Sequence, residues 1–124
     1  MSQKYYVCAT CGKIIEVVNE AKVDTICCGS PMKELIPCST DGDKEKHVPF
    51  VKIDGRNVHV TIGEVEHPMT EEHYIQWIAI ETKHGMQRKC LKPDCMPKAT
   101  FCLCEKDEFI SAYAYCNIHG LWKK

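Results

Sequence analysis

The sequence has no long apolar stretch and no excess of either charge. No run approaches the roughly 20 apolar residues that a membrane-spanning helix needs, and residues 1–4 lead into no apolar segment of the signal-peptide kind. The 16 basic residues are dispersed among 17 acidic ones, so the formal net charge is −1 and no basic stripe indicates nucleic acid. We therefore expect a cytoplasmic protein that binds neither a membrane nor nucleic acid.

Cysteine, in contrast, is abundant, with ten residues in a chain of 124. In a secreted protein this count predicts disulfides, but without a signal peptide it favours thiolates that bind metal. The chain length suits one ordinary domain, or a small domain together with a smaller unit that something other than a hydrophobic core stabilises.

The first third of the chain carries four of these cysteines in two pairs. Cys8 and Cys11 form a Cys-x-x-Cys turn followed by a glycine, and Cys27 and Cys28 are adjacent. A stretch of roughly 36 residues is too short for a core alone, so a metal bound by four thiolates would supply much of its stability. A structural zinc ribbon is one interpretation, but such a ribbon closes with a second Cys-x-x-Cys, whereas consecutive ligands distort the tetrahedron.

A second set of candidate ligands lies in the rest of the chain. Cys116 and His119 are three positions apart on a predicted turn, which lets both reach one metal ion. Upstream, His47, His67 and His73 each occur in a short polar segment. Four histidines and one cysteine are too many for a closed tetrahedral zinc site, and they favour a five-coordinate metal with one open position.

The segment between these sets, residues 37–44, is rich in turn formers, and we place a domain boundary there, giving domains 1–36 and 37–124. Short strands with turn signals between them follow, and they predict an all-β fold, an antiparallel sandwich. The expected strands are residues 48–53, 57–62, 74–81, 86–91, 99–104 and 109–115. Residues 68–72 allow one short helical turn. A sandwich gathers its loops at one edge, so the five ligands can converge.

The motifs resemble a known family. Residues 1–36 are similar to desulforedoxin, in which four cysteines in this arrangement hold one iron. The remainder resembles neelaredoxin and the catalytic domain of desulfoferrodoxin, the superoxide reductases. Three motifs in the right order carry this likeness: EKHVP at 45–49, GEVEHPMTEEHYI at 63–75 and YCNIHGLW at 115–122.

The resemblance implies a small metal-knuckle domain followed by an immunoglobulin-like, seven-stranded antiparallel β-sandwich, in a protein that commonly forms homodimers. It implies two iron ions per chain. One is held by Cys8, Cys11, Cys27 and Cys28, and the other by His47, His67, His73 and His119 with Cys116 as axial ligand. The implied reaction is the one-electron reduction of superoxide to hydrogen peroxide at the ferrous His/Cys site, which a small electron carrier such as rubredoxin then reduces again.

The resemblance also gives roles to Glu45 and Lys46. A lysine beside an open cationic metal attracts the superoxide anion and can orient a water that delivers a proton. Glu45 is expected to occupy the sixth position once the iron is ferric. On residue pattern alone, these two side chains would be assigned to a solvated, charged loop.

Three other functions remain open on the sequence. A non-catalytic two-iron electron-transfer protein has no use for an open coordination position beside a lysine. A zinc-dependent binding module is disfavoured by the adjacent cysteines and by the lack of a basic surface. A superoxide dismutase must also oxidise superoxide, for which ferric iron stabilised by a thiolate and a carboxylate is a poor oxidant.

Several residues fall outside the matched ligands. We assign His59 and His84 to surface or hydrogen-bonded positions, and Trp77 and Trp122 to core and edge packing. For the remaining cysteines we favour buried, apolar packing, with a peroxide-sensitive thiol pair or an adventitious metal site as the alternative. These are Cys38, Cys90, Cys95, Cys102 and Cys104.

Overall fold

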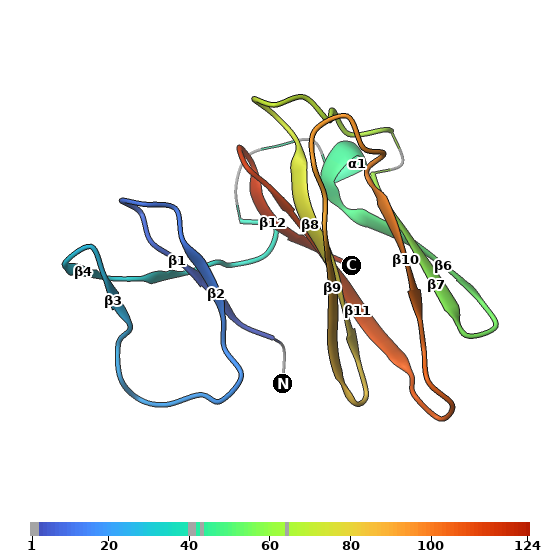
Figure 1. The fold of residues 1–124 in the computed structure, drawn as a ribbon, viewed down its shortest axis with the longest axis horizontal. Coiled ribbons are helices and arrows are strands. Elements are labelled where there is room, and N and C mark those ends of the chain that lie inside the picture. Colours follow the sequence, from blue (N-terminus) through green and yellow to red (C-terminus); the bar gives the residue numbers. More distant parts are fainter. Residues whose placement is uncertain (1–2, 40–41, 43, 64) are drawn as a thin grey trace. The chain divides into compact units, whose positions relative to one another are not determined.

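A computed structural model describes residues 3–39, 42, 44–63 and 65–124, without the side chain of Glu45. The backbone divides into two compact units, Met1–Ile36 and Pro37–Lys124 (Figure 1). The division falls at the start of the turn-rich segment.

The first unit consists of short strands. β1 (Tyr5–Val7) lies between β2 (Ile14–Glu16) and β5 (Lys33–Glu34) in a three-stranded antiparallel sheet, and β3 (Ile26–Cys27) and β4 (Ser30–Pro31) form a separate hairpin. Among its described residues, three hydrophobic side chains are buried: Tyr5, Cys8 and Met32. So small a core is consistent with a fold that depends on metal binding.

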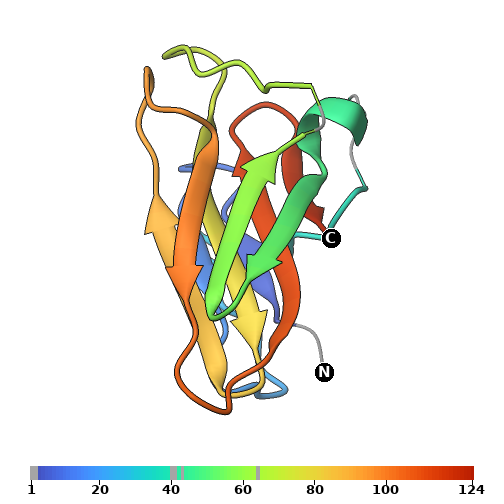
Figure 2. The same ribbon diagram turned by 90° about the vertical axis from the view of Figure 1, so that its right-hand side faces the viewer.

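The second unit is a sandwich of two antiparallel sheets (Figure 2). The three-stranded sheet has the order β10-β7-β6, with β6 at Pro49–Asp54, β7 at Asn57–Ile62 and β10 at Lys98–Cys102. The four-stranded sheet has the order β12-β11-β8-β9, with β8 at Ile75–Thr82, β9 at Gly85–Cys90, β11 at Phe109–Cys116 and β12 at Gly120–Lys123. The expected all-β fold with a seven-stranded antiparallel sandwich is therefore confirmed.

The core of the sandwich follows from alternation along the strands. In β7, Val58, Val60 and Ile62 are fully buried, while the residues between them are partly exposed. Because side chains alternate between the two faces of a strand, this register points every second residue of β7 inward. Ala112 and Ala114 of β11 belong to the same cluster of buried residues. Each large aliphatic group buried in this way stabilises the unit by about 1.5–3 kcal/mol, before any metal binds.

Three local features differ from the sequence expectations. The strand β12 was not expected from the residue pattern. The one helix in the described part of the chain is the single turn α1 (Lys44–His47), which lies in a segment expected to be a loop. The short helical turn that residues 68–72 allow is not formed, because Thr70 and His73 bond to each other through their backbones in a tight turn. No described helix is long and apolar enough to cross a membrane.

Candidate metal centres

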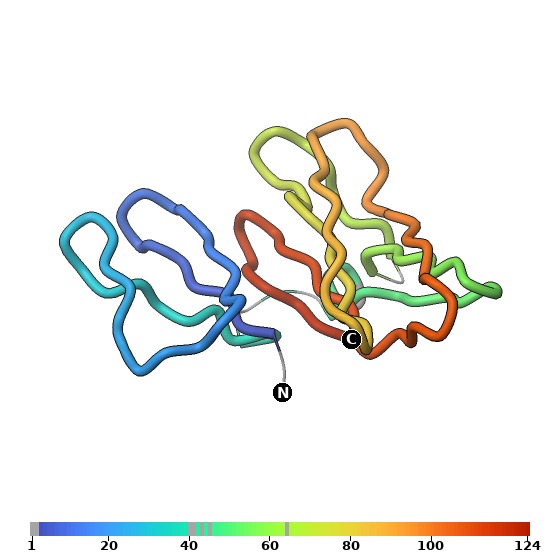
Figure 3. Tube along the Cα trace, turned by 60° about the horizontal axis from the view of Figure 1, so that its bottom comes forward, coloured from blue at the N-terminus to red at the C-terminus, as the bar shows by residue number. Residues whose placement is uncertain are grey.

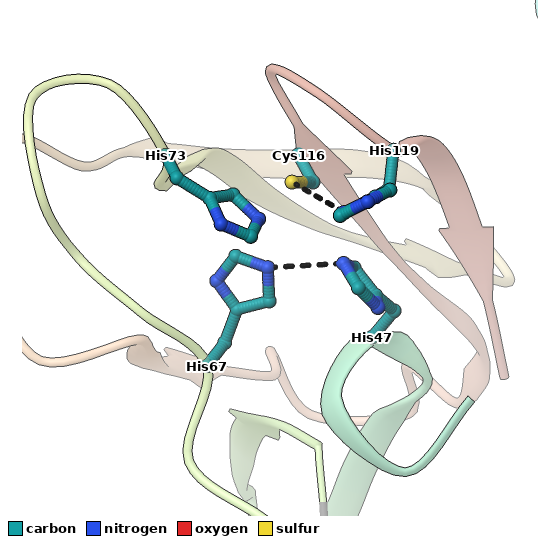
Figure 4. Close-up of side chains that lie close together, drawn as sticks. All are labelled: His47, His67, His73, Cys116 and His119. Carbon is teal, nitrogen blue, oxygen red and sulfur yellow. Dashed lines mark hydrogen bonds between the residues drawn. The ribbon is translucent and has the colours of Figure 1, made fainter. Parts of the chain in front are cut away.

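Five potential ligands gather at one end of the sandwich, where α1, the β7–β8 loop and the β11–β12 turn meet (Figure 2). His47 is the last residue of α1, and His67 and His73 lie in the β7–β8 loop. Cys116 ends β11, and His119 lies in the turn after it. One potential ligand atom from each residue lies within 4.8 Å of all the others. The side chains point toward one another from these four segments (Figure 4).

His67 is held as a neutral donor. Its Nδ1 lies 2.7 Å from the carbonyl oxygen of Pro68 and donates to it, which leaves the lone pair on Nε2 free. That Nε2 faces the Nε2 of His47 at 3.1 Å (Figure 4). Burial lowers the pKa of His67 to about 4, so the ring is neutral near pH 7.

His73 and Cys116 contribute two more buried potential donor atoms to the set. The Nε2 of His73 is buried and has no hydrogen-bond partner among the described groups. The Sγ of Cys116 lies 3.8 Å from Nδ1 of His119, and burial raises the pKa of this thiol. A buried thiol of this kind ionises when a cation takes the place of its proton.

These observations fit one metal ion between the five side chains. An orphaned buried nitrogen is costly unless something binds it, and two ring nitrogens that face each other at 3.1 Å suit a shared cation. Imidazole and thiolate donors match iron as well as zinc and copper, whereas magnesium and calcium prefer oxygen ligands. A metal held by these five donors could still take one further ligand.

Trp122 supports two of the ligands, a role that the sequence interpretation missed. Its ring stacks on His47 with centroids 4.9 Å apart, and its Nε1–H donates to the carbonyl oxygen of His119 at 3.0 Å. The side chain is 1% exposed. Its position in the YCNIHGLW motif was the available signal, but the residue was assigned to edge packing.

Lys46 lies on α1 next to His47, and its side chain is partly buried. Its positive charge contributes, after burial and the charge of His119, to a lowered pKa of His73, which indicates that the ammonium group is near the site. The expected role of Glu45 concerns a side chain outside the described part of the structure.

The two other histidines do not join the cluster. His59 forms a hydrogen bond with Oγ1 of Thr100 at 2.9 Å, and Nδ1 of His84 lies 3.5 Å from Asp107. Their assignment to surface or hydrogen-bonded positions outside the metal set is confirmed.

A second cluster, formed by Cys8, Cys11, Cys27 and Cys28, has its potential ligand atoms within 4.8 Å of one another. The loop after β1 and the β3–β4 hairpin, which carry the two pairs, lie side by side in the chain trace (Figure 3). The Sγ atoms of Cys11 and Cys27 are 3.6 Å apart.

The adjacent pair needs an unusual backbone. Side chains of consecutive residues in extended backbone point in opposite directions. Cys28 has a φ of 51°, in the left-handed region that non-glycine residues seldom adopt, and this breaks the alternation after Cys27. Both thiols can therefore face one ion.

The charges of this cluster also indicate a bound cation. Backbone N–H groups of Cys11 and Thr10 lower the pKa of Cys8 to about 6, so its thiolate is favoured. Hydrogen bonding with Cys11 raises the pKa of Cys27 to about 12. Full ionisation of the set therefore requires a metal to offset the repulsion between thiolates.

The favoured interpretation of the other five cysteines was wrong. All of them are exposed, so they do not pack as small apolar residues in the core, and none belongs to a metal-binding group among the described residues. Cys102 ends β10, and its neighbours on that strand alternate between buried and exposed. These residues are Cys38, Cys90, Cys95, Cys102 and Cys104.

A small four-cysteine unit followed by an antiparallel sandwich with four histidines and one cysteine at its end defines a two-centre β metalloprotein. The family described as desulfoferrodoxin, N-terminal domain, matches residues 2–35, and the desulfoferrodoxin family matches residues 39–124. The chain belongs to the desulfoferrodoxin family.

Individual relatives cover nearly the whole chain. A desulfoferrodoxin homolog from Archaeoglobus fulgidus is 48% identical over 118 residues, which cover 95% of this chain and 93% of the relative. The desulfoferrodoxin of Nitratidesulfovibrio vulgaris is 43% identical over 118 residues, which cover 95% of this chain and 92% of the relative. The crystal structure of the superoxide reductase from Treponema pallidum superposes with a TM-score of 0.85 at 33% identity, covering 100% of this chain and 99% of that one. The two clusters match two iron ions per chain, one with four cysteines and one with four histidines and a cysteine.

Proposed function

We propose that this protein is a superoxide reductase, which converts superoxide to hydrogen peroxide. The observation that carries the proposal is the convergence of four histidines and one buried cysteine on one point in the second unit. One electron and two protons are consumed for each superoxide, and no dioxygen is released. The reaction removes superoxide, so we propose a role in detoxification under oxidative stress.

The donor atoms suit this chemistry. His47, His67, His73, His119 and Cys116 are the proposed ligands. Iron held by them would supply the electron for superoxide and could take the substrate as a further ligand. Neutral imidazoles add no negative charge to the site, and burial keeps His67 in that form. Cys116 contributes the anionic, electron-rich donor from the fully buried end of β11.

Lys46 is the proposed substrate-handling residue. Its ammonium group acts on the pKa of His73, so its positive charge lies where it can attract a small anion toward the ligands. It can also hold a water that donates a proton to the departing product. Glu45 is proposed to occupy the open position after electron transfer, and this role stays a prediction.

We further propose that residues 1–36 form a four-cysteine iron domain and residues 37–124 the superoxide reductase domain. The first would act as an electron relay or as structural support. A small electron carrier such as rubredoxin is the proposed donor, and a cytoplasmic homodimer is the proposed state. These statements rest on the family resemblance.

The test is the stoichiometry of the reaction. The iron-loaded, reduced protein is mixed with superoxide without oxygen, and peroxide and dioxygen are both measured. A superoxide reductase yields peroxide equal to the superoxide consumed and no dioxygen. A dismutase yields half as much peroxide together with dioxygen, and an electron carrier does not accelerate superoxide loss. Cys116→Ser should abolish both the thiolate-to-iron absorption band and the activity, and activity retained without the band would contradict a role for the thiolate.

A further inference from the structure

Asn117 joins the two loops that carry three of the five clustered ligands. Its Oδ1 accepts a hydrogen bond from the backbone N–H of Tyr74 at 3.0 Å, and its Nδ2 donates to the carbonyl oxygen of Glu72 at 2.9 Å. Its own backbone N–H donates to the carbonyl oxygen of Tyr74 at 3.2 Å. One carboxamide thus binds the residues immediately before and after His73.

The hydrogen bonds of the Asn117 carboxamide differ from those that the His73 backbone itself makes. The N–H of His73 is bonded to Oγ1 and to the carbonyl oxygen of Thr70, both at 3.2 Å. Those bonds fix the shape of the turn, but they lie within one loop and cannot fix where the turn sits. The bonds from Asn117 cross to the turn between Cys116 and His119, so they set the distance between His73 and these two ligands.

The position of His73 needs such support. Its ring lies at 4.7 Å from that of His67 and 5.0 Å from that of His119, centroid to centroid, and its Nε2 has no described hydrogen-bond partner. Among the described residues no hydrogen bond to Nε2 orients this ring, in contrast to His67, whose Nδ1 bonds to Pro68. The hydrogen bonds from Asn117 instead restrain the backbone on both sides of His73 and thereby limit where its ring can lie.

We propose that Asn117 is a positioning residue that places His73 for metal binding. Asparagine suits this position because its carboxamide offers one acceptor and one donor, which match an N–H and a carbonyl oxygen in the same loop. Aspartate would set a second oxygen against the carbonyl of Glu72. The proposal depends on the metal site and not on the reaction with superoxide, so either can fail without the other.

The experiment measures the affinity of the full-length protein for Fe²⁺ by competition with a graded series of chelators, without oxygen. Asn117→Ala should weaken binding at the His/Cys site about tenfold or more, the range found when hydrogen-bond partners that orient metal ligands are removed. The absorption of the four-cysteine centre should not change, which provides an internal control. Asn57→Ala is the matched control, because Asn57 begins β7 and is exposed, and it should bind Fe²⁺ normally.

A double-mutant cycle separates positioning from general destabilisation. If Asn117 acts through His73, then Asn117→Ala should have no further effect on Fe²⁺ affinity in a His73→Ala background. An equal loss of affinity in both backgrounds, or no loss in either, would overturn the proposal. If the alanine variant does not fold, as judged by tryptophan fluorescence, Asn117→Asp is taken through the same cycle with the same expected results.

Discussion

The metal-free protein should lose stability as the pH falls from 7 to 4, and His67 should account for much of the loss. Its side chain is 2% exposed, and burial lowers its pKa from 6.5 to about 4 in the folded state. The unfolded chain therefore binds the proton first. The stability contribution is fully present above pH 6.5 and is lost as the pH falls toward 4.

The magnitude follows from the shift. At 1.36 kcal/mol per pKa unit, the change from 6.5 to about 4 corresponds to about 3 kcal/mol between pH 7 and pH 4. Burial also lowers the pKa of His73, which adds a loss of the same sign. For a domain stabilised by about 5–15 kcal/mol, this loss is a large share of the total.

Urea unfolding of the metal-free protein at several pH values measures this effect. Both tryptophans of the chain, Trp77 and Trp122, lie in the second unit, so their fluorescence reports on the sandwich alone. His67→Gln should remove most of the slope of stability against pH, whereas His59→Gln should keep it. The quantity compared is the slope of the free energy of unfolding against pH, because a glutamine at a buried site also changes the free energy of unfolding at every pH. Equal slopes in the two variants would refute the assignment to His67.

Other substitutions probe the remaining parts of the two centres. Lys46→Ala should slow the reaction with superoxide severalfold at low salt and flatten its salt dependence with the metal content unchanged, and an unchanged low-salt rate would rule out steering by this lysine. Serine at both Cys8 and Cys11 should remove the visible spectrum of the four-cysteine centre only; a folded variant without superoxide reduction would show that the centres are obligately coupled. Trp122→Phe keeps an aromatic ring but loses the bond to the carbonyl of His119. It should lower the free energy of unfolding by about 1 kcal/mol and shift the spectrum of the His/Cys centre, and an identical spectrum would contradict its support of the ligand.

The sequence was most informative where residue type and spacing carry the chemistry. The Cys-x-x-Cys and Cys-Cys pairs and the five residues of the second cluster were all identified before the structure, and the structure brings each set together. Six of the seven strands of the sandwich were expected, and each expected end lies within two residues of the observed one. Alternation and turn residues mark these strands in the sequence.

What the sequence did not predict depends on contacts between distant segments. β12 has only four residues and is paired with β11, and so short a segment shows no periodic pattern in the sequence. The supporting contacts of Trp122 and Asn117 likewise reach elements far away in the chain. The exposed cysteines were misjudged because cysteine is usually buried as a residue type, and burial at one position is decided by the local face of the strand.

The core of the sandwich is complete without any contribution from the five ligands other than Cys116. We therefore expect this site to form before iron binds, in contrast to the first unit, whose small core is consistent with a fold that depends on metal. A preformed site of imidazoles and a thiolate binds divalent copper and zinc at least as tightly as ferrous iron, according to the general order of divalent affinities. We therefore expect the ion in the second unit to be set by which metals are available once the unit has folded, and expression in zinc-rich, iron-poor medium should yield a folded, colourless and inactive catalytic unit.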